Sequence, residues 1–324
     1  MKTRLTDRLG VAHPIIQAPM AFAAGGKLAA AASRSGALGM IGGGYGDPDW
    51  IDRQFAIAGD AMVGCGFITW ALSERPWLLP KALEYGAQAI FLSFGDPAPF
   101  AKTVSQAGVP LICQIQTLED ARHAMDIGAD VIVAQGTEAG GHGESRGTMA
   151  LVPEVADEIS RRNLAVALAA AGGISDGRGL AAALALGADG VVVGTRYLVS
   201  NEALVHPRVL KAALRTSGDE TIRTRVLDVI RGYNWPERYT ARVLRNAFIG
   251  NWHGAENALI DDLEAQQRFW FDAQSGGDPS IAAAFLGEGI GLIGNTLGAE
   301  DIARTLMQQA HASRRSWSAD PNSS

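Results

Sequence analysis

Short apolar segments recur along the first two-thirds of the chain, and several of them do not alternate with polar residues. Continuous apolar runs of this length are typical of parallel strands that are buried on both faces. Successive segments begin 20 to 34 residues apart, which leaves room for one helix and two turns. Eight strands are therefore predicted, beginning near Pro14 (PIIQAPM), Leu38 (LGMIGGG), Met62 (MVGCGFIT), Ala89 (AIFLSFG), Leu111 (LICQIQ), Val131 (VIVAQG), Ala165 (AVALAAAGG) and Gly190 (GVVVGTR).

Helical patterns fill the spaces between these segments, and five of them stop at a glycine, namely Gly36, Gly86, Gly108, Gly128 and Gly187. A glycine after the last helical residue takes up the left-handed conformation that ends a helix, and the chain can then turn directly into the next strand. Eight strand–helix units predict a (β/α)8 TIM barrel. A doubly wound sheet uses the same alternation, but the nearly even spacing favours a closed barrel.

The pattern changes after the eighth predicted strand. Residues 216–280 read as helical and contain three of the seven tryptophans, Trp235, Trp252 and Trp270. We therefore expect a TIM barrel made of residues 1–215 and 281–315, into which residues 216–280 are inserted as a helical lid and substrate domain over the C-terminal face. Residues 316–324 are mostly polar and predict a disordered tail.

The composition narrows the class of protein. Hydrophobic residues make up 47% of the 324 residues and charged residues 19%, which provides a large core and excludes global disorder. The net charge of −6 argues against nucleic-acid and anionic-membrane partners. Cys65 and Cys113 lack the spacing of a metal site or a disulfide framework, and neither a long apolar run nor a secretory signal is present. We therefore expect a cytoplasmic protein without a metal site.

The loops that follow the predicted strands should carry the chemistry, because the active sites of TIM barrels lie at the carboxyl ends of the strands. Gly172 and Gly173 follow the seventh strand, and Gly194 and Thr195 follow the eighth. Glycines at these two places let backbone N–H groups approach an anion, and barrels frequently bind a phosphate there. The alternative is that the glycines only turn the chain. A helix that starts near Asp176 would add the attraction of its N-terminal dipole.

Four polar or soft side chains at strand ends are candidates for binding and catalysis. His142 lies in a glycine-rich loop after the sixth strand, and its ordinary pKa suits proton abstraction near neutral pH. The alternative is a loop histidine held by a backbone carbonyl. Met20 could pack on a planar ring or belong to the core. Gln114 and Gln116 share one face of the fifth strand, which suggests hydrogen bonding to a heteroaromatic ligand or solvated strand ends.

These segments together resemble the nitronate monooxygenase family, formerly called 2-nitropropane dioxygenases. The resemblance runs from residue 14 to about residue 310 and rests on PIIQAPM, GMIGGG, GFITW, LSFGDP, VIVAQGTEAGGHG, AAGGISDGRGLAAALALGADGVVVGTRY and LRN. The pairing of EAGGHG with AAGGI and GTR is specific to this family and its close flavin-barrel relatives. The resemblance implies an FMN-dependent (β/α)8 barrel with a helical lid, and it leaves a homodimer open.

The resemblance also implies roles for individual residues. His142 matches the family's catalytic histidine, which would lie near flavin N5 and deprotonate a neutral nitroalkane or orient the nitronate. The reaction would pass electrons from an alkyl nitronate to FMN and then to O2, and it would release a carbonyl compound and nitrite. Gly172, Gly173, Gly194 and Thr195 would hold the FMN phosphate, and the ring and ribityl chain would lie against Ala18, Pro19, Met20, Gly43, Thr69, Gln116, Gln135, Gly136, Ala139 and Gly140.

One departure from the family's pattern concerns the substrate. Glu288, in the segment GEGIGLI, stands where relatives often carry glutamine, next to the expected position of the flavin ring. An acid there could alter the flavin potential or the preference for substrate charge, because a nitronate is an anion. Glu288 is therefore a candidate on the substrate side.

Three other functions are compatible with the same residues. NAD(P)H-dependent flavin reductases, such as enoyl-thioester and quinone reductases, use this scaffold and share the GGH loop. A lyase or isomerase of a phosphorylated substrate could use the anion site without flavin. A flavin-binding protein without activity is the third alternative.

Overall fold

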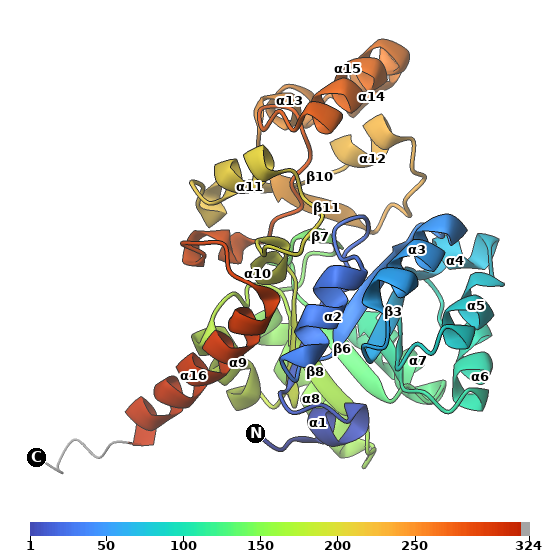
Figure 1. Cartoon of the computed structure of the whole chain (residues 1–324), viewed down its shortest axis with the longest axis vertical. Helices are drawn as coiled ribbons and strands as arrows, with labels where there is room; N and C mark the ends of the chain where they lie inside the picture. Colours follow the sequence, from blue (N-terminus) through green and yellow to red (C-terminus); the bar gives the residue numbers. More distant parts are fainter. Residues whose placement is uncertain (319–324) are drawn as a thin grey trace, which may run out of the picture.

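Eight parallel strands form a barrel in the computed structural model, which describes residues 1–318 (Figure 1). Their order is β1-β9-β8-β6-β5-β4-β3-β2, and a parallel bridge between Ile16 and Leu38 joins the two ends of this order. Each strand lies where an apolar run predicted it, so the TIM barrel is confirmed. The bounds are β1 Ile15–Gln17, β2 Gly39–Gly44, β3 Val63–Ile68, β4 Ile90–Ser93, β5 Leu111–Ile115, β6 Val131–Gln135, β8 Ala167–Ala171 and β9 Gly190–Val193.

The helices between the strands also lie where they were predicted. They are α2 Gly26–Arg34, α3 Pro48–Ala58, α5 Leu78–Glu84, α6 Ala98–Gln106, α7 Leu118–Asp126, α8 Thr148–Arg161 and α9 Gly177–Ala185, with the short helices α4 Thr69–Glu74 and α10 Thr195–Leu198 directly after β3 and β9. All five predicted stop glycines have φ between 70° and 95°. This left-handed conformation confirms the predicted way of ending the helices.

Two apolar layers hold the barrel together, one inside the ring of strands and one between the strands and the helices. Met40, Phe91 and Val133 fill the inner layer and are almost completely buried. The short helix α1 (Arg4–Leu9) inserts Leu5 into this layer beside Gly190, where a Cβ would lie only 2.3 Å from the leucine Cδ2. Leu5 therefore closes the end of the barrel at which the strands begin, and the opposite end carries the cavity.

Residues 216–280 were predicted to be helical. This prediction is wrong in part, because the segment after β9 also contains strands. It runs through α11 Pro207–Ala213, η1 Gly218–Glu220, β10 Thr221–Thr224, α12 Val226–Arg231, β11 Thr240–Leu244, α13 Ala247–Trp252, α14 Glu256–Asp261 and α15 Leu263–Gly276. The strands β10 and β11 form an antiparallel sheet with β7 (Gly141–Gly143), which lies in the loop after β6. Both strands are rich in β-branched residues, a composition that favours strands over helices.

The small sheet therefore joins the insertion to the barrel. Figure 1 shows helices α12–α15 at the opposite end of the molecule from α1. Whether residues 216–280 act as a lid, and whether they form a separate domain, stays a prediction.

The chain returns to the barrel through η2 (Glu288–Leu292) and α16 (Ala299–Ser318), and α16 packs against α9 and α2. Residues 316–318 belong to this helix and not to the predicted tail. The remainder of that prediction, residues 319–324, lies outside the described residues. Within residues 1–318, no helix has both the length and the apolar character needed to cross a membrane.

Candidate active site

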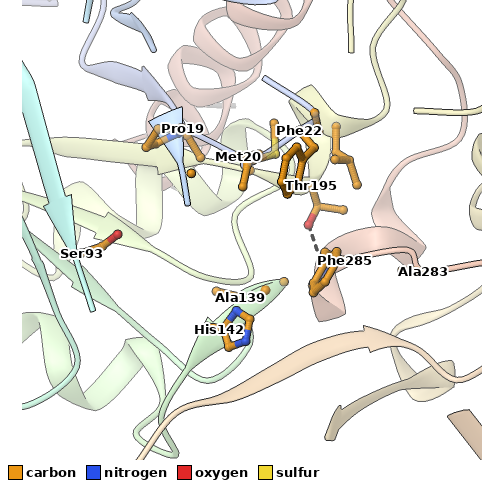
Figure 2. Close-up of a pocket in the computed structure, with 18 of the residues that line it drawn as sticks. Pro19, Met20, Phe22, Ser93, Ala139, His142, Thr195, Ala283 and Phe285 are labelled. Atoms are coloured by element: carbon orange, nitrogen blue, oxygen red, sulfur yellow. Dashed lines mark hydrogen bonds between the residues drawn. The ribbon is translucent and has the colours of Figure 1, made fainter. Parts of the chain in front are cut away.

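A cavity of about 540 Å³ lies at the carboxyl ends of the barrel strands, between the strand-end loops and the insertion. This volume falls within the roughly 300–1,000 Å³ that is usual for small-molecule sites. Figure 2 shows Met20, His142, Thr195 and Phe285 around it, each contributed by a different part of the chain. Eleven of the predicted site residues line the cavity: Ala18, Pro19, Met20, Gln135, Ala139, Gly140, His142, Gly172, Gly173, Gly194 and Thr195.

His142 is buried between the barrel and the insertion. It lies on β7, opposite Ala241 of β11. Its ring stacks on Trp235, with centroids 3.4 Å apart and planes inclined by 6°. Its Nε2 lies 2.8 Å from Oδ1 of Asp228 in α12, and the two side chains are 7% and 4% exposed. The barrel loop thus supplies the histidine, and the insertion supplies the groups that position it.

The surroundings of His142 favour its neutral form. Burial lowers the pKa of His142 below its ordinary value, although the hydrogen bond and charge of Asp228 act to raise it. The nearby positive charges of Arg231 and Arg223 also act to lower this pKa. An ionised carboxylate can only accept, so Nε2 donates to Asp228 and Nδ1 of the neutral ring is left as a proton acceptor. The carboxylate of Asp228 thus fixes the orientation of a neutral imidazole that keeps one free acceptor nitrogen.

The loops after β8 and β9 carry the four residues of the predicted anion site, and all four line the cavity. Gly172 and Gly173 have φ of 104° and 73°, values that larger residues adopt only with strain. None of the hydrogen bonds among residues 1–318 uses the backbone N–H groups of Gly173 and Gly194, so both are available to an anion. Thr195 Oγ1 accepts a hydrogen bond from the backbone N–H of Gly287 at 2.9 Å, which ties the returning chain to this site.

The helix α9 begins at Gly177, beside Asp176 as predicted, but its first backbone donors already have partners. Oδ1 of Asp176 accepts hydrogen bonds from the backbone N–H groups of Arg178 at 2.9 Å and Gly179 at 3.2 Å. The N–H of Gly177 donates to Oε1 of Gln309 at 2.9 Å. The first helical donors are therefore occupied, and a carboxylate already stands where an anion would bind. An anion at this helix end would compete with Asp176, and the dipole contribution to the anion site stays a prediction.

Three glutamines meet on one wall of the cavity. Gln114 and Gln116 both donate to Oε1 of Gln135, at 3.1 Å and 2.8 Å, which confirms that they share one face of β5. Gln114 and Gln135 line the cavity, whereas Gln116 lies behind them. Because Oε1 of Gln135 already accepts two hydrogen bonds, this side chain offers its NH2 group to a ligand.

Three further predicted residues lie behind the wall rather than on it: Gly43, Thr69 and Gly136. A Cβ on Gly136 would lie 2.1 Å from Oγ1 of Thr148, and one on Gly43 would lie 2.8 Å from the Phe67 ring. The hydroxyl of Thr69 is buried and has no hydrogen-bond partner among the described residues. In this structure the two glycines thus permit close packing of the loops.

Glu288 was expected on the substrate side of the cavity, but its side chain does not line it. Its carboxylate forms an ion pair with Arg242 of β11 at 2.8 Å, and its side chain is 43% exposed. Its neighbours Gly287 and Gly289 line the cavity, but Glu288 does not. The attraction of Arg242 therefore directs the carboxylate away from the position beside the flavin ring that was predicted for it.

Several residues around the cavity were not anticipated from the sequence. Asp228 contacts His142, and Tyr45, Arg231, Tyr233 and Phe285 line the walls. Asp228 lies 86 positions from His142 along the chain, so no local spacing connects the two. In the sequence, the only feature that pointed to a contribution of the insertion to the cavity was the aromatic content of residues 216–280. The fold and site together define a TIM-barrel enzyme in which a buried histidine and two glycine-rich loops meet at one cavity.

Comparison with known proteins identifies the family. Residues 2–61 and 78–309 match the nitronate monooxygenase family. A nitronate monooxygenase of Neurospora crassa is 33% identical, over 91% of this chain and 88% of that protein. FabK from Thermotoga maritima is 28% identical with a TM-score of 0.83, over 98% of this chain and 99% of that one. A nitroalkane oxidase from Streptomyces ansochromogenes is 26% identical with a TM-score of 0.78, over 97% and 99% of the two chains.

The chain therefore belongs to the nitronate monooxygenase family, which confirms the resemblance drawn from its sequence motifs. Membership of this family also makes it an oxidoreductase of the FMN type.

The role of Asp228 can be tested through the pKa of His142. Asp228→Asn removes the negative charge that favours the imidazolium, so we expect the pKa of His142 to fall further below its ordinary value. An NMR titration of the imidazole measures the change. Asp96→Asn is the matched control, because Asp96 pairs with the exposed His123 at 2.7 Å and not with His142. An unchanged or raised His142 pKa in Asp228→Asn would contradict the assignment.

The same burial predicts how stability depends on pH. Unfolding returns the pKa of His142 to about 6.5. On acidification, the unfolded chain therefore binds a proton at His142 at a higher pH than the folded chain does. This contribution to stability is therefore complete above about pH 6.5 and is lost as the pH falls from there through the folded pKa.

Proposed function

We propose that this protein oxidises alkyl nitronates with O2 in an FMN-dependent reaction that yields a carbonyl compound and nitrite. The observation that carries the proposal is the buried His142–Asp228 pair in the same cavity as the glycine anion site. The family and the likeness to a nitroalkane oxidase support the choice of nitro compounds as substrates.

The residues around the cavity fit FMN. The unused N–H groups of Gly173 and Gly194 suit a phosphate, which binds well to converging backbone donors. A Cβ on Gly140 would lie 2.6 Å from the backbone nitrogen of Gly287, so only glycine lets these two loops meet beside the cavity. Ala18 and Met20 on the facing wall offer apolar contact to a planar ring. When bound, FMN supplies the redox chemistry by accepting electrons from the substrate and passing them to O2.

His142 prepares the substrate in this proposal. Its neutral ring takes the proton from the carbon next to the nitro group of a nitroalkane, and Asp228 stabilises the imidazolium that results. A substrate that arrives as a nitronate needs no proton transfer, and His142 then orients it by hydrogen bonding. The stacked ring of Trp235 and the nearby ring of Phe285 exclude water from this place.

A flavin reductase driven by NAD(P)H is the second candidate. The observation that favours it is the similarity to FabK from Thermotoga maritima over almost the entire length of both chains. A shared barrel does not fix the reaction, because function depends on the site and not on the fold.

Product formation separates the two candidates. The purified protein is given an alkyl nitronate in air, and nitrite release and O2 consumption are measured. We expect both, with one nitrite released for each nitronate consumed. Consumption of NADH or NADPH with a suitable acceptor, without nitrite release from the nitronate, would contradict the proposal and support the reductase.

The role of His142 as a base is tested by His142→Ala. We expect this variant to retain FMN and activity on preformed nitronates but to lose about 10²- to 10⁴-fold in kcat/KM for neutral nitroalkanes. His123→Ala, on the exposed side of α7, is the control. Unchanged turnover of the neutral nitroalkane would remove His142 as the base.

The phosphate site is tested at Gly173. Gly173→Leu places a bulky side chain on a left-handed residue beside the unused donors, so we expect FMN to be retained at lower occupancy after gel filtration. Gly108→Leu carries the same backbone strain (φ of 70°) at the end of α6, with open space around it and no cavity contact. Full FMN occupancy in Gly173→Leu would place the phosphate elsewhere.

A further inference from the structure

Arg231, the last residue of α12, lies on the cavity wall inside a cluster of aromatic rings. Its guanidinium carbon is 4.6 Å from the ring centroid of Tyr233, 5.4 Å from Tyr45, 5.6 Å from Phe285 and 5.7 Å from Phe22. Tyr45 and Tyr233 stack on each other with centroids 3.8 Å apart. We call Arg231 and these four rings the arginine cage. Cation–π attraction holds the guanidinium in place and takes it partly out of water.

The donors of this guanidinium are unused. Among residues 1–318, Arg231 forms no ion pair and its side chain donates no hydrogen bond, although a guanidinium has five N–H groups. The nearby arginines of the insertion differ, because Arg223 and Arg242 both donate to the carbonyl of Thr137, at 3.1 Å and 2.9 Å. An arginine on a cavity wall with unused donors is suited to bind an anion from outside the chain.

The arginine cage opens into the same cavity as His142. The ring of Phe285 belongs to the cage, and its centroid also lies 6.3 Å from that of His142. Tyr233 of the cage is followed two residues later by Trp235, which stacks on His142. The charge of Arg231 acts on His142 and helps to lower its pKa. A small molecule in the cavity can therefore reach both residues.

Strain in the backbone indicates that the cage is held in place. Phe22 has φ of 61°, a left-handed value that residues other than glycine rarely adopt. Strain of this kind persists only where the surroundings enforce it, and it is common around ligand sites. The ring of Phe22 is nearly half exposed, so burial alone does not account for its position.

We propose that Arg231 is the residue that recognises the charge of the substrate, by binding a planar oxyanion group through the edge of its guanidinium. A guanidinium offers two parallel N–H donors along one edge, which match the two coplanar oxygens of a planar oxyanion. The oxyanion is either the nitronate group itself or a carboxylate elsewhere on the substrate, since both present two coplanar oxygens. This inference rests on the proposed function and adds to it a determinant of specificity.

Steady-state kinetics of three variants test the assignment. Arg231→Met removes the charge and keeps an apolar side chain, and Arg231→Lys keeps the charge but loses the planar edge. The control is Arg225→Met, at the exposed start of α12 and outside the cavity. For Arg231→Met we expect KM for the anionic substrate to rise about 10- to 100-fold, with kcat changed by no more than roughly twofold. The KM of Arg231→Lys should lie between those of Arg231→Met and the unaltered protein. Arg225→Met should change neither KM nor kcat.

Two substrates distinguish the two sources of the oxyanion. One is a simple alkyl nitronate, and the other is a nitronate that also carries a carboxylate. A rise in KM for both assigns Arg231 to the nitronate group, and a rise for the carboxylated compound alone assigns it to the carboxylate. Unchanged KM for both substrates in Arg231→Met would overturn the inference.

A binding measurement separates this inference from the proposed function. Sodium nitrate, a planar oxyanion that cannot react, is titrated calorimetrically into the purified protein and the three variants. We expect nitrate to bind the unaltered protein and Arg225→Met, and to bind Arg231→Met at least about tenfold more weakly. Equal binding by Arg231→Met would contradict the oxyanion subsite. Failure of the unaltered protein to oxidise nitronates would contradict the proposed function but leave the nitrate result to decide on Arg231.

Discussion

The pairing of β7 with β11 is the constraint on which the site depends. The strand β7 has only three residues, Gly141 to Gly143, and it lies in the loop after a barrel strand. Its partner β11 lies about a hundred residues later, so this pairing fixes the insertion to the carboxyl ends of the barrel strands. His142 is the central residue of β7, and the register that pairs the strands also sets its position against α12.

The contacts of the cavity follow from this attachment. The barrel contributes the glycine loops and the apolar residues near Met20, and the insertion contributes Asp228, Trp235 and Arg231. Neither part of the chain encloses His142 alone. Because the insertion covers it, the imidazole is buried, and burial is the main cause of its lowered pKa. The same cover makes the charge of Arg231 effective, since charges interact more strongly away from bulk water.

The barrel could be predicted from the sequence because its signals are local. Strands buried on both faces are continuous apolar runs, and glycines such as Gly36 and Gly187 end helices through their own backbone conformation. For the same reason the loop positions of His142, Gly173 and Gly194 could be predicted, because each lies in a loop that follows a barrel strand.

The remaining features depend on contacts between distant segments. The ion pair of Glu288 with Arg242 and the hydrogen bond from Gly177 to Gln309 become visible only in three dimensions. The strands of the insertion could not be predicted because their surroundings read as helical and β11 pairs with β7, about a hundred residues earlier. Asp228 lacked any local motif, and its function depends entirely on where the small sheet places it.

The central claim is that this cavity brings a nitronate to a flavin between the barrel and the insertion. An anaerobic absorbance titration tests it most directly, with an alkyl nitronate added to one sample of the purified protein and NADPH or NADH added to another. We predict that the nitronate alone bleaches the flavin absorbance. Bleaching by the pyridine nucleotide alone, or a protein without a flavin band even after FMN is added, would contradict the account.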